Sequence, residues 1–258
     1  MHAADRERKI SDMMKSRGFV SFQEVEAQLD ASPATIRRDL ARMEIEGRLV
    51  RVRGGAKAAD SVVPPSGGLA GVPFQENIGR HAAQKAVIGR TAAQLCVPGE
   101  GIMVDGGSTT LQMCPHLDGL NLQVLTNSLH IVNVLLPQTG TRILLPAGSV
   151  FREQNIILSA AGEESMPRFH APKLFMGAAA LGAQGLMQAD VVLVAAERRL
   201  IERAEEIIVL VDSSKFHGSS GHVVCDLAEI DTIVTDAGIS TAQRKMIESA
   251  GIRLIIAS

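Results

Sequence analysis

The sequence predicts an α/β protein in two parts, a small helical N-terminal part with a basic strand and a larger part built on a mostly parallel sheet. Within the first 57 residues, helix caps mark the start of short helices. After residue 73, short apolar runs alternate with helical stretches, which is typical of parallel strands joined by crossover helices. A chain of 258 residues with 46% hydrophobic residues is long enough to form two cores.

Two helices open the N-terminal part. Around Ile10 the apolar residues recur at helical spacing, which predicts the first helix. Ser21 and Glu24 have the spacing of a capping box, in which each residue's side chain bonds to the backbone of the other. This pattern predicts a second helix with Val25 and Leu29 facing inward.

A third helix is the best-marked element of the chain. Ser32 is a suitable N-cap, and Pro33 suits the first helical position because its missing N–H would have no partner there. At 100° per residue, Ile36 and Leu40 fall on one face and Arg38 lies roughly opposite. The apolar face is therefore expected to pack while the arginine face stays free.

A basic strand follows this helix. Residues 49–53 alternate apolar and basic side chains before Gly54-Gly55, which suits a wing lying along a DNA backbone. The net charge of the chain is −2, so a basic island from 32 to 57 is poorly explained by a solvated amphipathic helix, the alternative interpretation. We therefore expect a winged helix-turn-helix that places its third helix in the major groove. The expected DNA contacts are Ser32, Ala34, Thr35, Arg37, Arg38, Arg42, Arg51 and Arg53.

The expected domain limits are residues 1–57 for DNA binding, 58–73 for a linker with two adjacent prolines, and 74–258 for an effector-sensing α/β domain. Apolar runs in the last part predict a Rossmann-like sheet with strands at 102–104, 122–125, 142–145, 174–176, 207–211, 232–234 and 254–256. Helical stretches are expected at 84–95, 129–136, 191–204 and 241–250.

Polar residues collect where three of these strands end, the edge at which such sheets bind ligands. Glycine, serine and threonine are also ordinary turn residues, but the same chemistry at three strand ends favours a binding site. An anion would lie between the amides and hydroxyls of 107–110 and the Lys215 ammonium. The expected effector contacts are Asp105, Gly106, Gly107, Ser108, Thr109, Thr110, Thr126, Asn127, Arg152, Asn155, Glu197, Asp212 and Lys215.

Several of these segments together resemble the DeoR family of bacterial transcriptional regulators. The resemblance rests on Arg6, Ile10, SPATIRRDL at 32–40, the Gly-Gly-Ala ending at 54–56, DGGSTT at 105–110 and VDSSKF at 211–216. It implies a winged helix-turn-helix followed by a sensor domain similar to ribose-5-phosphate isomerase, and repression of a carbohydrate-utilisation operon under a small anionic effector. Operator DNA and that effector are the partners that it implies.

An enzyme with an accessory DNA-binding domain is the alternative, and a DNA-binding module that senses nothing is the third possibility. The isomerases need carboxylates after the strand that 174–176 resembles, and residues 177–182, Gly-Ala-Ala-Ala-Leu-Gly, have none. We therefore expect no catalytic residues and no cofactor.

Other features of the sequence bear on metal binding, disulfides, membrane contact and self-association. His217, His222 and Cys225 supply three scattered ligands and no fourth, so no metal site is expected. Three widely spaced cysteines predict free thiols. The charged start and the lack of a long apolar segment predict a cytoplasmic protein without membrane contact. A single small DNA-reading module binds weakly alone, so a homodimer or homotetramer joined beyond the linker is expected.

Overall fold

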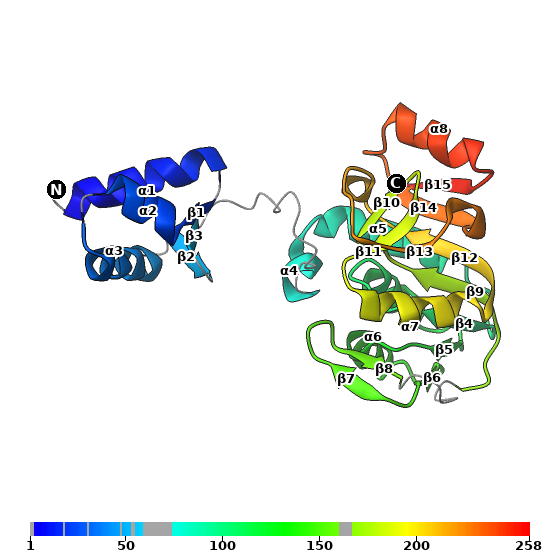
Figure 1. Ribbon diagram of the computed structural model, residues 1–258. Coiled ribbons are helices and arrows are strands. Elements are labelled where there is room, and N and C mark those ends of the chain that lie inside the picture. Colours follow the sequence, from blue (N-terminus) through cyan, green and yellow to red (C-terminus); the bar gives the residue numbers. More distant parts are fainter. Residues whose placement is uncertain are drawn as a thin grey trace. The chain divides into compact units, whose positions relative to one another are not determined.

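A computed structural model of the chain describes residues 3–17, 19–29, 31–46, 48–52, 55–58, 74–159 and 167–258. The chain forms two compact units, residues 1–68 and 69–258, each of which is treated by itself below (Figure 1). The predicted linker, 58–73, lies outside the described residues from 59 onward.

The N-terminal unit contains three helices and a small antiparallel sheet of order β1-β3-β2. The helices are α1 (Ala3–Arg17), α2 (Phe22–Gln28) and α3 (Pro33–Ile45), and the strands are β1 (Phe19–Ser21), β2 (Leu49–Val52) and β3 (Gly55–Ala58). The strand β1 was not predicted, because three residues are too few to establish an alternating pattern. The expected turn residues Arg53 and Gly54 lie outside the described residues.

The helix starts in this unit confirm the predicted caps. Ser21 forms a capping box with Glu24, and the Ser32 hydroxyl accepts a hydrogen bond from the amide of Thr35 at 3.2 Å. Apolar side chains from all three helices and the sheet form one core, whose buried members are Ile10, Val20, Val25, Leu29, Ile36, Leu40, Met43, Leu49 and Ala56. The predicted inward faces of α2 and α3 are therefore confirmed.

The larger unit is built on a seven-stranded sheet of order β15-β14-β12-β9-β4-β5-β6, in which every neighbouring pair is parallel. Its strands are β4 (Gly101–Val104), β5 (Gln123–Leu125), β6 (Arg142–Leu144), β9 (Ala171–Met176), β12 (Ala204–Leu210), β14 (Thr232–Asp236) and β15 (Arg253–Ala257). All seven predicted runs are strands of this sheet, which confirms the mostly parallel α/β architecture.

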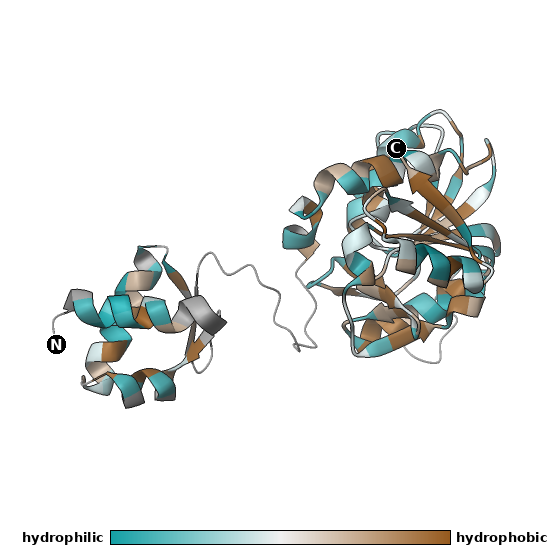
Figure 2. Ribbon diagram, turned by 90° about the horizontal axis from the view of Figure 1, so that it is seen from above, coloured by the Kyte–Doolittle hydropathy of each residue, from teal (hydrophilic) through white to brown (hydrophobic). Residues whose placement is uncertain are grey.

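Helices and short connections cover both faces of the sheet. Because side chains alternate along a strand, Ile102 and Val104 pack on one face with α5 (Ala82–Ala93), η1 (Thr110–His116) and α6 (Leu129–Leu135). Met103 packs on the other face with α7 (Val191–Ile201) and α8 (Thr241–Ser249). The strands are accordingly the most hydrophobic ribbons at the centre of this unit (Figure 2).

Two small antiparallel additions were not predicted. A sheet of order β10-β11-β13 consists of β10 (Ala180–Gly182), β11 (Gly185–Gln188) and β13 (His222–Cys225), and a hairpin pairs β7 (Ser149–Phe151) with β8 (Ile156–Leu158). Each strand has only three or four residues, so none carries a recognisable alternating pattern. The remaining elements are the short helices α4 (Phe74–Gly79), η2 (Ser213–Phe216) and η3 (Leu227–Glu229). Of these, α4 is attached to the rest of the unit at two points, by the Phe74 ring stacked on the His130 ring and by the Lys85 ammonium, which donates to Asn77.

Candidate DNA-reading surface and effector site

The outer face of α3 presents the predicted DNA-reading residues. Ala34 and Arg38 are exposed, and the Ser32 cap holds the first turn in place. Among the described residues, Arg38 has no ion-pair partner. This arginine therefore carries its charge into solvent from the first turns of the helix, where a recognition helix meets base edges.

The neighbouring arginines are held by the protein. The Arg37 guanidinium lies over the Phe22 ring, 5.2 Å from its centroid, which fixes α2 against α3. Arg42 donates to Glu7 and, at 3.2 Å, to Asp39. Its side chain is still 48% exposed, so one edge of the guanidinium remains accessible.

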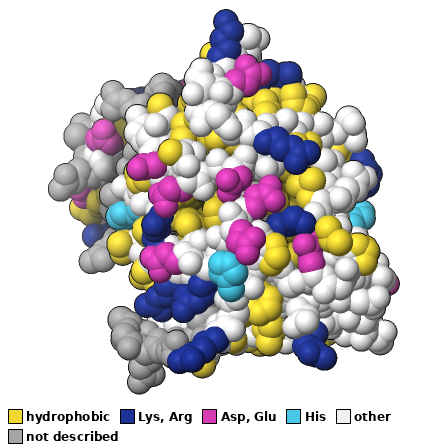
Figure 3. Space-filling view, turned by 90° about the vertical axis from the view of Figure 1, so that its right-hand side faces the viewer, with side chains coloured by type: hydrophobic (Ala, Val, Ile, Leu, Met, Phe, Trp, Pro, Cys, Tyr) yellow, Lys and Arg dark blue, Asp and Glu magenta, His cyan; other side chains and the backbone are white. Residues whose placement is uncertain are grey.

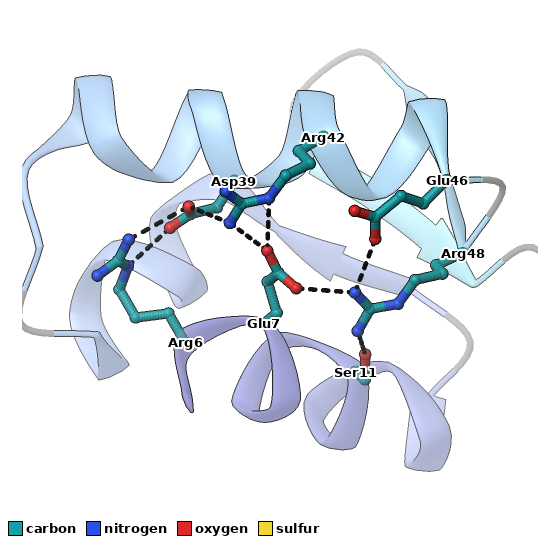
Figure 4. A network of polar contacts seen from close by, with 7 residues as sticks. All are labelled: Arg6, Glu7, Ser11, Asp39, Arg42, Glu46 and Arg48. Atoms are coloured by element: carbon teal, nitrogen blue, oxygen red, sulfur yellow. Dashed lines mark hydrogen bonds and ion pairs between the residues drawn. The ribbon is translucent and has the colours of Figure 1, made fainter. Parts of the chain in front are cut away.

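A network of seven polar residues locks α1 against α3 (Figure 4). Arg6 donates two hydrogen bonds to Asp39, and Glu7 accepts from Arg42 and Arg48. Hydrogen bonding to Arg48 lowers the pKa of Glu7, although burial opposes this shift. The network is completed by Ser11 and Glu46, which both contact Arg48.

Two predicted DNA contacts on the wing have no described side chain. Arg51 belongs to β2, where only its backbone is described, and Arg53 lies outside the described residues.

In the larger unit, the face drawn in Figure 3 intermixes lysines and arginines with acidic side chains. This face therefore offers no surface of a single charge sign among the described residues.

The predicted effector residues meet where the chain changes direction across the sheet. From β4 the chain continues to β5 and β6 on one side, and β9 then lies on the other side of β4 and leads to β12. The carboxyl ends of β4, β9 and β12 are therefore adjacent. Ligands bind outside such a switch point in open parallel sheets.

Asp105 follows β4 directly and is buried. Its backbone N–H donates to the carbonyl of Phe175, and its carboxylate accepts from the Asn127 amide at 3.4 Å. The Asn127 side-chain oxygen accepts in turn from the Gly106 N–H at 3.2 Å, so the ends of β4 and β5 are joined. Burial raises the pKa of Asp105 to about 6, while the hydrogen bonds from Gly106 and Asn127 act in the opposite direction.

The glycines after Asp105 permit a tight loop. A Cβ on Gly106 would lie 2.7 Å from the Ile156 Cγ2 of the β8 strand. The Gly107 N–H donates to the Thr110 hydroxyl at 2.9 Å, so this amide is already satisfied. Among the described residues, the amides of Ser108, Thr109 and Thr110 have no acceptor, and these loop donors are open to an anion.

Two buried carboxylates at the site each have an oxygen without a hydrogen-bond partner. Glu197, on α7, accepts from the Gln188 amide at 2.6 Å through Oε1, and its Oε2 has no partner. Burial, and then the charge of Asp105, raise the pKa of Glu197 well above its ordinary value. Asp212 accepts from the Ser214 amide through Oδ1, and its buried Oδ2 has no partner. Buried acceptors of this kind are expected to meet donors from a ligand.

A cluster of positive charge faces Asp212. Lys215 lies on η2, and burial lowers its pKa, with Asp212 acting in the opposite direction. Sequence reasoning did not identify Lys85, which lies on α5 and is only 1% exposed. Burial and then the charge of Lys215 lower the pKa of Lys85 to about 8, and Arg80 acts in the same direction. The helical spacing of Lys85 with the buried Ile88 is the signal that would have placed this lysine inward.

Other predicted contacts have different surroundings. Thr126 is buried and accepts from the amide of Ser128, which makes it part of the turn after β5. Asn155 lies in the turn of the β7–β8 hairpin, with a positive φ of 51°, and its side chain contacts the His130 Nε2 at 3.0 Å. Arg152 is exposed in the same turn. The structure thus links Asp105 to Asn127 and Glu197, and Lys215 to Asp212, whereas these three lie in the turn after β5 and in the β7–β8 hairpin.

The site also holds acidic side chains outside the loop that the sequence argument considered. Residues 177–182 indeed contain no carboxylate, but Asp105 and Glu197 bring two acidic side chains close enough for the charge of one to raise the pKa of the other. The absence of acids from a single loop therefore does not by itself exclude acid–base groups from the site.

Comparison with known proteins decides the family. A model described as "DeoR C terminal sensor domain" matches residues 80–237, and one described as "DeoR-like helix-turn-helix domain" matches residues 6–62. The chain belongs to the DeoR family. Its two DeoR-family segments correspond to the two units of the structure and to the resemblance noted in the sequence.

Relatives match this DeoR-family protein over nearly its whole length. A putative aga operon transcriptional repressor of Escherichia coli O157:H7 is 31% identical over 98% of this chain and 93% of its own. The HTH-type transcriptional regulator UlaR of Shigella dysenteriae serotype 1 is 28% identical over 99% of both chains. This DeoR-family protein is therefore a DNA-binding transcriptional regulator and not an enzyme.

Solved structures show a more distant likeness. A ribose 5-phosphate isomerase from Methanocaldococcus jannaschii has 17% sequence identity and a TM-score of 0.37, covering 51% of this chain and 53% of its own.

Within the described residues, no helix is long and apolar enough to cross a membrane, and no three His, Cys, Asp or Glu side chains group as metal ligands. The three cysteines are free thiols.

Proposed function

We propose that this regulator reads its operator through the outer face of α3, with Arg38 contacting a base edge in the major groove. The small side chain of Ala34 and the capped first turn permit close approach of the helix to DNA. Arg37 and Arg42 are positioned by protein partners and contact the phosphate backbone with their exposed edges. Arg51 and Arg53 extend this contact along the wing.

The effector is a small carbohydrate that carries an anionic group, and a phosphate fits best. The observation that carries this proposal is the pairing, in one site, of unpartnered buried carboxylate oxygens with the buried Lys85 and the half-buried Lys215. Glu197 Oε2 and Asp212 Oδ2 need donors, which ligand hydroxyls supply. Lys215 and the amides of residues 108–110 need an anion, which hydroxyls alone do not supply.

The regulated genes encode carbohydrate utilisation, and the protein represses them until its effector is bound. A relative named as a repressor of the aga operon supports repression as the direction of control. Repression that the effector relieves requires the effector to bind more tightly to the form with low operator affinity, because equal affinity for both forms shifts nothing.

Self-association through residues beyond 73 supplies the second DNA-reading module. A single helix-turn-helix has few base contacts, and two symmetric half-sites double them. Exposed apolar side chains on neighbouring elements of the larger unit, Val191 and Val192 on α7 and Val223 on β13, support a partner surface there. Light scattering is expected to give a dimer or tetramer at operator-saturating concentrations, and a monomer would contradict this proposal.

The effector proposal is tested by calorimetry with a panel of pentose and hexose phosphates. Lys215→Ala is expected to weaken binding of the best ligand while operator affinity stays unchanged, which gives a regulator that no longer responds. Lys245→Ala removes an equally charged but exposed lysine on α8 and is the matched control. Equal affinity in wild type and Lys215→Ala would remove Lys215 from the site, and turnover of any sugar phosphate would contradict a purely binding role.

A further inference from the structure

The short helix η2, which carries Lys215, is held by a carboxylate from a neighbouring strand of the large sheet. Asp236 is the last residue of β14, which pairs in parallel with β12, so the carboxyl ends of these two strands are adjacent. The Ser213 N–H donates to Asp236 Oδ1 at 2.7 Å, and the Ser213 hydroxyl donates to Oδ2 at 2.9 Å. Both oxygens of the buried Asp236 therefore hold the first residue of η2.

The hydrogen bonds of Asp212 do not replace this attachment. Its carboxylate accepts from the N–H and the hydroxyl of Ser214, and its carbonyl accepts from the Lys215 N–H. These bonds lie within four consecutive residues, so they shape η2 without joining it to β14. They also satisfy the amides of Ser214 and Lys215, as Asp236 satisfies that of Ser213. The group that η2 can offer to an anion is therefore the Lys215 ammonium.

Gly238 leaves the room that this attachment needs. Its N–H donates to Asp236 Oδ2 at 2.9 Å. A Cβ on Gly238 would lie 2.5 Å from the Ser213 Oγ and 2.8 Å from Asp236 Oδ2, so a side chain there would push Ser213 off the carboxylate. Burial opposes ionisation of Asp236, yet the hydrogen bonds from Ser213 and Gly238 lower its pKa below the ordinary value. These donors thus keep Asp236 charged and accepting.

We propose that Asp236 is a positioning residue of the effector site, which holds η2 so that the Lys215 ammonium faces the anion-binding loop of residues 107–110. This inference rests on the proposed function of that site. Asp236 does not contact the effector and acts through Ser213 and Lys215. When the attachment is lost, η2 moves away from the end of the sheet, and an anion at the loop loses its charge-assisted partner.

The position of Lys215 can be tested without any ligand, by labelling lysines with acetic anhydride at a series of pH values and measuring each lysine by mass spectrometry. Burial lowers the pKa of Lys215 in the wild type. Asp236→Asn and Gly238→Ala are both expected to raise this pKa toward its ordinary value and to speed the labelling, because the ammonium becomes solvated. Gly238→Ala leaves the charge unchanged, so it separates the effect of position from the loss of the Asp236 charge. The exposed Lys245 is the internal reference.

Calorimetry with inorganic phosphate tests the consequence for binding. Asp236→Asn and Gly238→Ala are each expected to weaken phosphate binding by about tenfold or more, because a charge-assisted contact is lost. Melting curves check that each variant is folded, and Gly238→Ala gives the answer if Asp236→Asn is not.

Each variant has a matched control. Asp231 precedes β14 and accepts from the Ile207 N–H at 2.7 Å, so Asp231→Asn weakens the same kind of contact at the opposite end of the sheet. It is expected to leave phosphate affinity and the labelling of Lys215 unchanged. Gly218→Ala is the control for Gly238→Ala, because a Cβ on Gly218 would lie 3.5 Å from its nearest neighbour, an ordinary contact distance.

The outcomes separate this inference from the proposed function. If Lys215 keeps its wild-type pKa and labelling rate in both variants, Asp236 does not position it and the inference is wrong. Equal losses of phosphate affinity in Asp231→Asn and Asp236→Asn would also overturn it, since they would show a general loss of stability. If labelling changes as expected but the wild type binds neither phosphate nor any sugar phosphate, Asp236 does position Lys215 and the proposed effector site is wrong.

Discussion

The Arg6 guanidinium of α1 donates to both carboxylate oxygens of Asp39 on α3, from Nε to Oδ2 at 2.7 Å and from Nη2 to Oδ1 at 3.2 Å. This bidentate pair fixes both the distance and the direction between the two helices. Because Arg38 directly precedes Asp39, the buried pair holds in place the turn of α3 from which Arg38 projects. The buried Asp39, which holds the two helices together, and the exposed Arg38, which we propose reads the DNA bases, are thus neighbours in the sequence.

Asp39→Asn is expected to lower the melting temperature of the N-terminal unit and to weaken operator binding. The substitution keeps the shape of the side chain but removes the charge that Arg6 and Arg42 contact. Circular dichroism melts and operator titrations provide the two measurements. Asp5→Asn, at an exposed position on α1, is the control, and equal effects from both substitutions would argue against a special role for the pair.

Arg38→Ala is expected to reduce specific operator affinity with little change in melting temperature. A good base contact contributes about 1–3 kcal/mol, which corresponds to a loss of roughly fivefold to 150-fold at each half-site. Fluorescence anisotropy at matched salt measures the effect. Arg8→Ala removes an exposed arginine from α1 and serves as a charge-matched control. Unchanged operator affinity in folded Arg38→Ala would show that α3 does not read the bases in this way.

Asp105→Asn is expected to stabilise the larger unit at neutral pH, at the expense of effector binding. Burial raises the folded-state pKa of Asp105 from 3.8 to about 6, so the stability that this group contributes below pH 4 is lost as the pH rises through 6. Removing the carboxyl avoids a cost of up to about 3 kcal/mol above that pH. The difference in melting temperature between variant and wild type should therefore widen from pH 5 to pH 8. A difference that is constant with pH would contradict the shift.

Gly89→Ala is expected to destabilise the larger unit although alanine favours helices. A Cβ at this position of α5 would lie 2.4 Å from the backbone carbon of Gln112, so α5 and η1 would have to separate. Overpacking of this kind costs about 1–3 kcal/mol, which exceeds the gain of about 1 kcal/mol in helix propensity. Chemical denaturation measures the balance. Gly79→Ala, where a Cβ would meet nothing within 4 Å, is the control that should be near neutral.

Sequence reasoning located the elements whose signals are local. The cap at Ser32, the capping box at Ser21 and the apolar runs of the large sheet are each determined by residues within one turn or one strand. The polar loops that follow β4, β5 and β12 were found because parallel strands place their carboxyl ends together.

The parts of the site that were missed depend on contacts between distant segments. Lys85 resembles a solvated helix lysine, although it lies one helical turn from the buried Ile88, and only the fold brings Asn77 to its ammonium. The effect of Asp105 on Glu197 joins the end of β4 to a helix more than 80 residues later. The pairing of Arg42 with Glu7 likewise joins two helices, which is why the sequence assigned this arginine to DNA alone.

The attachment of α4 also bears on how regulators of this kind can be recombined. A chimera that joins a foreign DNA-binding unit upstream of Phe74 retains Phe74, Asn77 and Lys85 together, and with them the contacts to His130 and the switch-point site. A junction placed after Gly79 would remove Phe74 and Asn77, and with them the stack on His130 and the hydrogen bonds that Lys85 donates. The useful boundary for building biosensors from this scaffold is therefore upstream of α4.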